Sequence, residues 1–194
     1  MPRLEKLPVR DLFDQASSTA PSPGGGAVAA VGGMLGIALI LKALRISQRK
    51  ADDPSAYASE DAELQALAAR LAEDADADER AFAAYVAAAR LPKSNEDERT
   101  VRAKALRRAA IAAAEAALEM LRHAKDAFAL SRRVEPAINR NIHADLIAGR
   151  EFLKVVRTVA VENCRANLAG LRDSTEANRL ERLMERYSAP TSFD

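Results

Sequence analysis

Three consecutive glycines, Gly24–Gly26, stand directly before a long apolar stretch. Glycines at the start of a helix leave backbone N–H groups open, and such groups bind anions. The segment lacks the Gly-Lys-Ser/Thr ending of a P-loop, and no predicted strand precedes it as a dinucleotide-binding turn would require. We therefore predict a ligand-binding loop made of Pro23, Gly24, Gly25 and Gly26, but neither kind of nucleotide site.

Four acidic residues between positions 74 and 79 supply carboxylates, the groups that most simply move protons in an active site. Acids in such a cluster commonly lie on a solvated helix face. Asp78 differs because it precedes Phe82 by one helical turn, close in register to an apolar stripe. We expect Asp78 to turn inward, where burial would raise its pKa toward the working range.

A second polar group, Asn139, Asn141 and Asp145, lies where a loop meets the next predicted helix. Asparagine side chains both donate and accept hydrogen bonds, so they suit a polar ligand, but they also form turns. Aspartate at the start of a helix is a common N-cap. For these three residues, ligand contact and a local structural role both remain open.

Few side chains are available for metal or thiol chemistry. The chain has two histidines and a single cysteine, Cys164. These numbers exclude an intrachain disulfide and a cysteine-cluster zinc site, and they favour a reducing, cytoplasmic compartment. Cys164 is expected to be a small buried hydrophobe, and His123 to lie at the edge of the core.

The elements that position these residues are predicted to be helices. Alanine occupies 43 of the 194 positions and aromatic residues make up 4%, which favours closely packed helices. Proline and capping residues in 91–95 separate two long amphipathic stretches, which predicts an antiparallel hairpin. The predicted helices cover residues 8–19, 25–50, 55–90, 97–134, 143–171 and 174–187.

This pattern predicts an all-α fold, an up-and-down bundle of about six helices in one domain, 1–194. Its core is expected within about 8–172, with a flexible tail at 188–194. The longest uncharged apolar run, Ala27–Leu41, has 15 residues, fewer than the roughly 18–20 that span a bilayer. We therefore expect a buried core helix there and no membrane partner.

Charge is balanced overall but uneven along the chain. Lysine and arginine number 29 against 28 aspartates and glutamates, which argues against a nucleic-acid partner. Residues 52–80 contain ten acids and two bases, whereas 99–133 contain nine bases and three acids. The two stretches would attract each other as neighbours, and the basic one is either a solvated face or a site for an anionic ligand.

Several motifs, in order and spacing, resemble those of the formiminotetrahydrofolate cyclodeaminase and methenyltetrahydrofolate cyclohydrolase family. The resemblance covers about residues 10–172. The matching segments are 16–30, 78–82 (Asp-Glu-Arg-Ala-Phe), 91–93 (Leu-Pro-Lys), 139–145, and the pair Asn163 and Asn167.

The resemblance implies an all-helical homodimer with its active site near the subunit junction. It implies a tetrahydrofolate derivative as substrate, and no metal or redox cofactor. The reaction would open or close the one-carbon bridge between N5 and N10.

Matching positions supply the site roles that the resemblance implies. Asp78 would transfer protons, and Lys93 would act electrostatically or as a proton donor. Asp145 is counted with them as a catalytic carboxylate, and with Asn139 and Asn141 it would contact the pterin edge. Lys50 would receive the glutamate tail.

We favour methenyltetrahydrofolate cyclohydrolase because no formiminotransferase domain is fused to the sequence given. Formiminotetrahydrofolate cyclodeaminase, which releases ammonia, is the alternative. A diverged, non-catalytic binding or dimerisation module is another, because Ile138, Ala144 and Ile147 replace small or hydroxylated residues of the family pattern.

Overall fold

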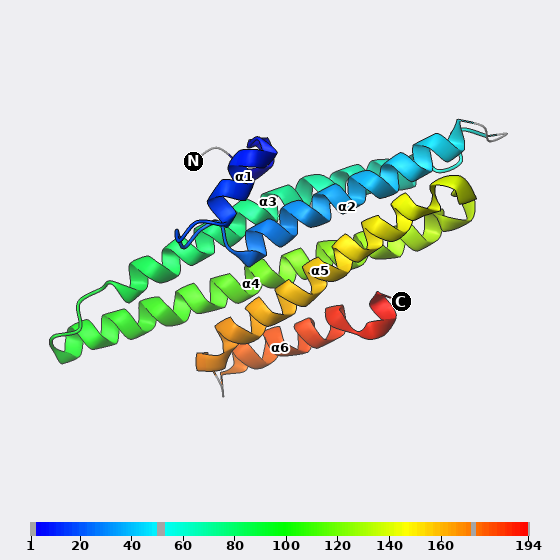
Figure 1. Ribbon diagram of the computed structural model, residues 1–194. Helices are drawn as coiled ribbons and strands as arrows, with labels where there is room; N and C mark the ends of the chain where they lie inside the picture. The colour runs from blue at the N-terminus through cyan, green and yellow to red at the C-terminus, as the bar shows by residue number, and fades with distance from the viewer. Residues whose placement is uncertain (1–2, 50–52, 172–173, 194) are drawn as a thin grey trace.

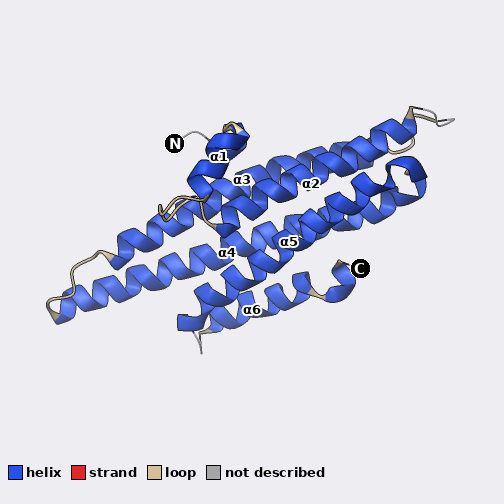
Figure 2. Ribbon diagram, in the orientation of Figure 1, coloured by secondary structure: helices blue, strands red, loops and turns tan. Residues whose placement is uncertain are grey.

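The computed structural model describes residues 3–49, 53–171 and 174–193, whose regular structure is entirely helical (Figures 1 and 2). The α-helices are α1 (Val9–Ala16), α2 (Gly25–Gln48), α3 (Ala58–Ala89), α4 (Glu96–Val134), α5 (His143–Leu168) and α6 (Thr175–Ser188). Their bounds lie within a few residues of the predicted ones, so the all-α fold is confirmed.

Four of these helices form an up-and-down bundle (Figure 1). Helix α2 packs against α3 and α5, and α4 packs against the same two helices from the other side. Helix α6 covers α4 and α5, while α1 lies outside the bundle and contains no buried residue. The bundle thus encloses a continuous core in which α2 is the most apolar element.

Helix α2 is long and apolar enough to cross a membrane by length and composition alone. In this structure, 61% of its most apolar 18-residue stretch is buried inside the bundle, as in the core helix of a folded domain. Ile37, Ile40 and Leu44 on its inner face are fully buried. The expected core helix is therefore present.

Helices α2 and α5 cross in backbone contact at Gly36 and Gly149. A Cβ atom added to Gly36 would lie 2.8 Å from the carbonyl oxygen of Gly149. Such a contact excludes any side chain at the crossing, which explains why small residues recur along α2. The neighbouring helix that these glycines admit is α5 of the same chain.

The predicted hairpin of α3 and α4 is also present, and both helices extend beyond the rest of the bundle (Figure 1). Asn95 starts α4 by accepting the N–H of Glu98 at 2.8 Å, and the Glu98 side chain accepts the N–H of Ser94 at 2.7 Å. The Asn95 side chain is the N-cap, and the Glu98 side chain adds a contact to the residue before it, so together they fix where α4 begins.

The end of the described chain differs from the expected flexible tail. Phe193 is buried, and its ring centroid lies 5.3 Å from that of Phe128. Arg157 also donates to the carbonyl oxygen of Ser188 at 2.6 Å. Residues 188–193 dock because Phe193 is one of the few large apolar side chains available to cover this alanine-rich core.

Candidate active site

The carboxylate of Asp78 lies where α3 passes the start of α2. Its Oδ2 accepts the backbone N–H of Ala27 at 3.0 Å, and its Oδ1 lies 3.5 Å from Nδ2 of Asn163 on α5. Burial raises the pKa of Asp78 above its ordinary value, against the opposing effect of the Ala27 hydrogen bond. Asp78 has thus turned inward as its register predicted, with the shifted pKa expected of a proton-transfer group.

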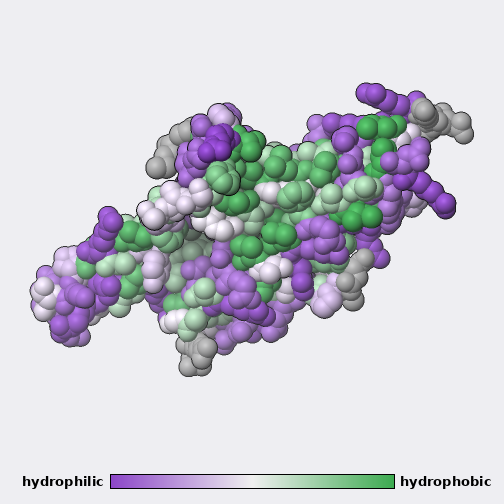
Figure 3. Space-filling model, viewed as in Figure 1, coloured by the Kyte–Doolittle hydropathy of each residue, from purple (hydrophilic) through white to green (hydrophobic). Residues whose placement is uncertain are grey.

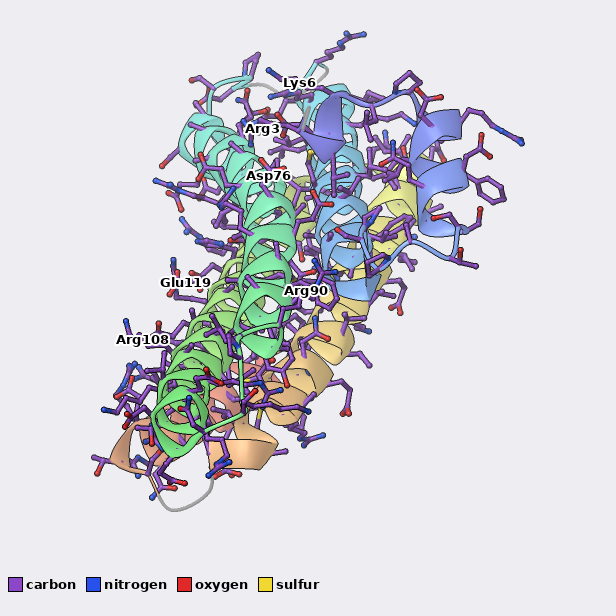
Figure 4. All side chains as sticks on the ribbon, turned by 90° about the vertical axis from the view of Figure 1, so that its left-hand side faces the viewer. Arg3, Lys6, Asp76, Arg90, Arg108 and Glu119 are labelled. Atoms are coloured by element: carbon purple, nitrogen blue, oxygen red, sulfur yellow. The ribbon has the colours of Figure 1, made fainter. Side chains whose placement is uncertain are left out.

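The other three acids of this cluster face different neighbours. Their partners are His123 for Asp74 (2.7 Å), Arg3 for Asp76 (3.0 Å) and Ser22 for Glu79 (2.6 Å). Figure 4 shows Asp76 near Arg3 of the N-terminal segment. Successive acids therefore point around α3, and Asp78 is the one whose carboxylate both faces the cavity and caps α2.

Gly26 is required at this site because the start of α2 lies directly against the carboxylate. A Cβ atom at position 26 would overlap Asp78 and would lie 2.6 Å from Nδ2 of Asn163. The same addition at Gly24 or Gly25 would meet nothing within 4 Å. Of the three glycines, Gly26 thus has a steric role, while Gly24 and Gly25 leave the loop open.

A cavity of about 330 Å³ opens in front of the Asp78 carboxylate. Its lining includes Ser22, Gly24, Gly25, Gly26, Asp78, Glu79, Phe82, Tyr85, Asn163 and Asn167. Within the described chain, the N–H groups of Gly25 and Gly26 have no hydrogen-bond acceptor, as is usual for the first turn of a helix. Open amides and a carboxylate therefore face one small volume.

The α5 asparagines and the aromatic residues of α3 complete this cavity. Asn167 donates to the carbonyl oxygen of Asn163 at 2.8 Å, which fixes one amide relative to the other. Phe82 and Tyr85 line the cavity, and both side chains are exposed. The sequence analysis assigned no site role to these residues, although the family resemblance at Phe82, Asn163 and Asn167 was an available signal.

The second predicted polar group lies at the opposite end of α2. Asn139 donates its backbone N–H to Ser47 at 2.8 Å, and Asp145 pairs with Lys42 at 2.8 Å. Because an α-helix rises 1.5 Å per residue, Ser47 lies about 30 Å along α2 from Gly26. Within one chain, the structure therefore does not bring Asn139, Asn141 and Asp145 to Asp78.

Contacts within the chain explain the positions of some residues in this second polar group. The side chain of Asn139 accepts the N–H of Asn141 at 2.9 Å, which is the turn-forming role that the sequence left open. Asp145 lies in the first turn of α5, but the N-cap position is Ile142. Asp145 is thus an ion-pair partner near the helix start and not its N-cap.

The remaining predicted site residues have separate positions. Pro23 is buried beside the cavity loop. Lys93 is exposed at the tip of the α3–α4 hairpin, beyond Ala89, where α3 ends about 16 Å along the helix from Asp78. Lys50 lies outside the described residues. The cavity of this chain therefore contains the predicted glycines and Asp78 but not Lys93.

The substitutions at positions 138, 144 and 147 do not narrow this cavity. Ile138 is buried in the core, and Ile147 is exposed on α5 with half of its surface accessible. Ala144 is exposed at the start of α5. None of them lines the volume in front of Asp78.

Buried Asp74 and His123 form a separate link between α3 and α4. Nε2 of His123 lies 2.8 Å from the guanidinium of Arg122, which only donates, so Nδ1 carries the proton donated to Asp74. Burial raises the pKa of Asp74, and the His123 hydrogen bond opposes that rise. Both side chains are buried, and His123 lies at the edge of the core as predicted.

Neither a thiolate nor a metal cluster is present in the part of the chain that the structure describes. Cys164 is buried, and burial raises the pKa of its thiol to about 11. No group of three histidine, cysteine or acidic side chains is placed to hold a metal ion among the described residues. The chemistry available at the cavity is that of the Asp78 and Glu79 carboxylates, side-chain amides and backbone N–H groups.

Sequence comparisons match nearly the whole chain. A family model described as formiminotransferase-cyclodeaminase matches residues 8–186. A curated protein, the methenyltetrahydrofolate cyclohydrolase of Methylorubrum extorquens, is 30% identical over 187 residues, covering 91% of this chain and 86% of that protein.

A solved structure has the same arrangement of helices. The formiminotetrahydrofolate cyclodeaminase of Thermotoga maritima superimposes with a TM-score of 0.82, covering 98% of this chain and 93% of that one. Sequence identity is 23%, so this match concerns the fold.

Proposed function

Because the chain belongs to the formiminotransferase-cyclodeaminase family, we propose that it opens or closes the N5–N10 one-carbon bridge of a tetrahydrofolate derivative. The proposed main reaction is hydrolysis of 5,10-methenyltetrahydrofolate to the 10-formyl form. The cyclohydrolase relative, at 30% identity over most of both chains, supports this choice of reaction.

The observation that carries the proposal is the Asp78 carboxylate, held beside the open amides of α2. Hydrolysis needs a base that takes a proton from water as the water oxygen bonds to the bridging carbon. A carboxylate whose pKa is raised by burial is a better base than an exposed one. Asp78 is the acid in the cavity with this property.

In the proposed hydrolysis, Asp78 first accepts a proton and later returns it. Water adds to the bridging carbon and gives its proton to the Asp78 carboxylate, which leaves a neutral tetrahedral intermediate. The C–N5 bond then breaks, Asp78 returns its proton to N5, and the hydroxyl proton is lost to solvent as the formyl carbonyl forms. The open N–H groups of Gly25 and Gly26 would stabilise the oxygen of the tetrahedral intermediate.

The second candidate is the cyclodeaminase reaction, favoured by the description of the matched family. In that reaction N10 attacks the formimino carbon, and the departing nitrogen must be protonated to leave as ammonia. Asp78 would move the proton from N10 to the leaving nitrogen. The same cavity therefore serves both reactions, and the product distinguishes them.

We further propose a homodimer formed through α2 and α5. Val28, Leu35 and Ile46 share one exposed face of α2, and Figure 3 shows hydrophobic residues gathered over α2 and α5. A twofold axis through the middle of this face would place the two copies of α2 antiparallel. Asp145 of the partner subunit would then lie beside the Gly24–Gly26 loop, so the two predicted polar groups would form one site.

Loss of the methenyltetrahydrofolate absorbance tests the proposed hydrolysis. Wild-type protein should accelerate the loss, and Asp78→Asn should lower the rate by about 10²- to 10⁴-fold, the usual contribution of acid–base catalysis. Asp76→Asn is the matched control, because Asp76 lies on the same helix but pairs with Arg3. Undiminished turnover by Asp78→Asn would overturn the assignment of Asp78.

Ammonia release from 5-formiminotetrahydrofolate, measured in parallel, separates the two reactions. Ammonia release without methenyl hydrolysis would establish the cyclodeaminase instead. Silence in both assays would favour the non-catalytic module.

A further inference from the structure

A second groove, of about 560 Å³, continues from the cavity of Asp78. Tyr85, Ala166 and Asn167 line both volumes, so the groove and the cavity share one wall. Tyr85 follows Asp78 by two helical turns, about 10 Å along α3. A ligand too long for the cavity would therefore pass Tyr85 and enter the groove.

The groove is apolar at its base and basic at its edge. Leu106, Ala110 and Leu171 provide apolar surface, whereas the charged side chains are Lys104 and Arg107 of α4. Three residues apart, these two bases project from the same side of the helix. Both are exposed, so their charged ends are accessible to a ligand.

These two bases, like Arg108, have no ion-pair partner within the described chain, whereas Arg99 and Arg102 are held by contacts of their own. Arg99 pairs with Glu96 at 2.7 Å, and Arg102 donates to the carbonyl oxygen of Ala89 at 3.2 Å. Residues 99–114 include five basic residues and no acidic one. Positive charge thus remains unneutralised at the edge of the groove.

We propose that Lys104 and Arg107 bind the carboxylates of the glutamate tail of the folate substrate. This inference rests on the proposed function, because it assumes that the one-carbon bridge lies at Asp78. The p-aminobenzoyl ring would lie on the apolar base beside Tyr85. Arginine suits this role because its guanidinium binds a carboxylate through two parallel hydrogen bonds.

The proposal gives the basic stretch of α4 a ligand and moves the tail site away from Lys50. Arg49, the neighbour of Lys50, ends α2 about 34 Å along the helix from Gly26, so it lies far from the cavity of its own chain. Lys104 and Arg107 instead adjoin the cavity directly. A tail held at Arg49 would require a second subunit, which the experiment below distinguishes.

The test compares methenyltetrahydrofolate with methenyltetrahydropteroate, which lacks the glutamate. Lys104→Gln/Arg107→Gln should raise KM for the glutamate substrate about tenfold or more, because it removes charge-assisted hydrogen bonds. The kcat for that substrate and the KM for the pteroate should stay unchanged. Arg108→Gln is the control, since Arg108 of α4, labelled in Figure 4, borders a different groove, with Ala84 and Ala88 of α3.

An equal rise in KM for both substrates, or no rise for either, would overturn the inference. A tenfold rise in the Arg49→Gln variant alone would assign the tail to the other end of α2 and would also overturn it. Equilibrium titration with 5-formyltetrahydrofolate measures folate binding directly, so this test does not depend on turnover. Glutamate-dependent binding that weakens only in the double variant would support the tail site even if no reaction occurs, whereas wild-type protein that binds no folate would overturn both proposals.

Discussion

The carboxylate of Asp78 accepts the backbone N–H of Ala27 at 3.0 Å, so a side chain of α3 caps the first turn of α2. The N-cap residue of α2, Gly24, has no side chain that could do so. One group therefore fixes the start of α2 and faces the cavity. Asparagine at position 78 keeps an acceptor for the cap but removes the titrating carboxylate, so it separates the two roles.

Asp78→Asn should stabilise the protein at neutral pH. Burial raises the pKa of Asp78 above 3.8 in the folded state, so the folded protein binds more protons than the unfolded chain just above that pH. Stability is therefore lost as pH rises from about 4 through the raised pKa, and the loss is complete above it. Asparagine does not titrate, so urea unfolding should show that the variant gains stability relative to the wild type between about pH 3 and pH 8. A variant that becomes relatively less stable as pH rises would contradict the shift.

Gly26→Ala should disturb both the fold near the cavity and its activity. The new methyl group would overlap the Asp78 carboxylate and would lie 2.6 Å from the Asn163 amide. Overpacking of this kind costs typically about 1–3 kcal/mol. Gly25→Ala is the matched control, because its methyl group would meet nothing within 4 Å. Thermal melting should distinguish the two; equal melting temperatures would mean that α2 shifts freely to admit the methyl group.

His123→Ala should destabilise the protein by about 3 kcal/mol, because it leaves the buried Asp74 carboxylate without its donor. His143→Ala is the control. That ring is partly exposed and lies 3.4 Å from Glu135, so its loss should change stability by less than about 0.5 kcal/mol. Chemical denaturation measures both. A small effect at position 123 would show that water replaces the histidine at Asp74.

Phe152→Asp should convert the proposed dimer to a monomer. This ring, on the apolar face of α5, is 41% exposed in the single chain. A carboxylate there would be desolvated in a dimer formed through α2 and α5. Val101→Asp, on an exposed part of α4, should leave the mass unchanged in light scattering. A wild-type protein of monomer mass would contradict the dimer and, with it, the joining of Asp145 to the cavity.

The sequence predicted the helices because their signals are local. Proline and capping residues separate α3 from α4, and the register of Asp78 with Phe82 predicted that Asp78 turns inward, although Asp74 of the same cluster is the more deeply buried acid. The partners of Asp78 were not predictable in this way, because Ala27 and Asn163 meet it only through the packing of three helices. Spacing along the chain does not specify such contacts.

Other site features depended on the length of the helices in space. Asn139 and Asp145 also resemble a family motif, yet the length of α2 separates them from Asp78. In the sequence, Lys104 and Arg107 belong to a basic stretch with no evident ligand. The structure shows that both line the same groove as Tyr85. Their relation to the cavity is a property of the bundle.

The backbone contact between Gly36 and Gly149 also determines the width of the cavity. Asp78 contacts α2 at Ala27 and α5 at Asn163, on the same side of the crossing. Gly26 is about 15 Å along α2 from the crossing, so a 5° change in crossing angle would move it by about 1.3 Å. A displacement near 1 Å is enough to misalign reacting groups. A methyl group at either glycine would therefore push α2 and α5 apart where they cross and change their crossing angle. This change would alter the distance between the amides at the start of α2 and the asparagines of α5.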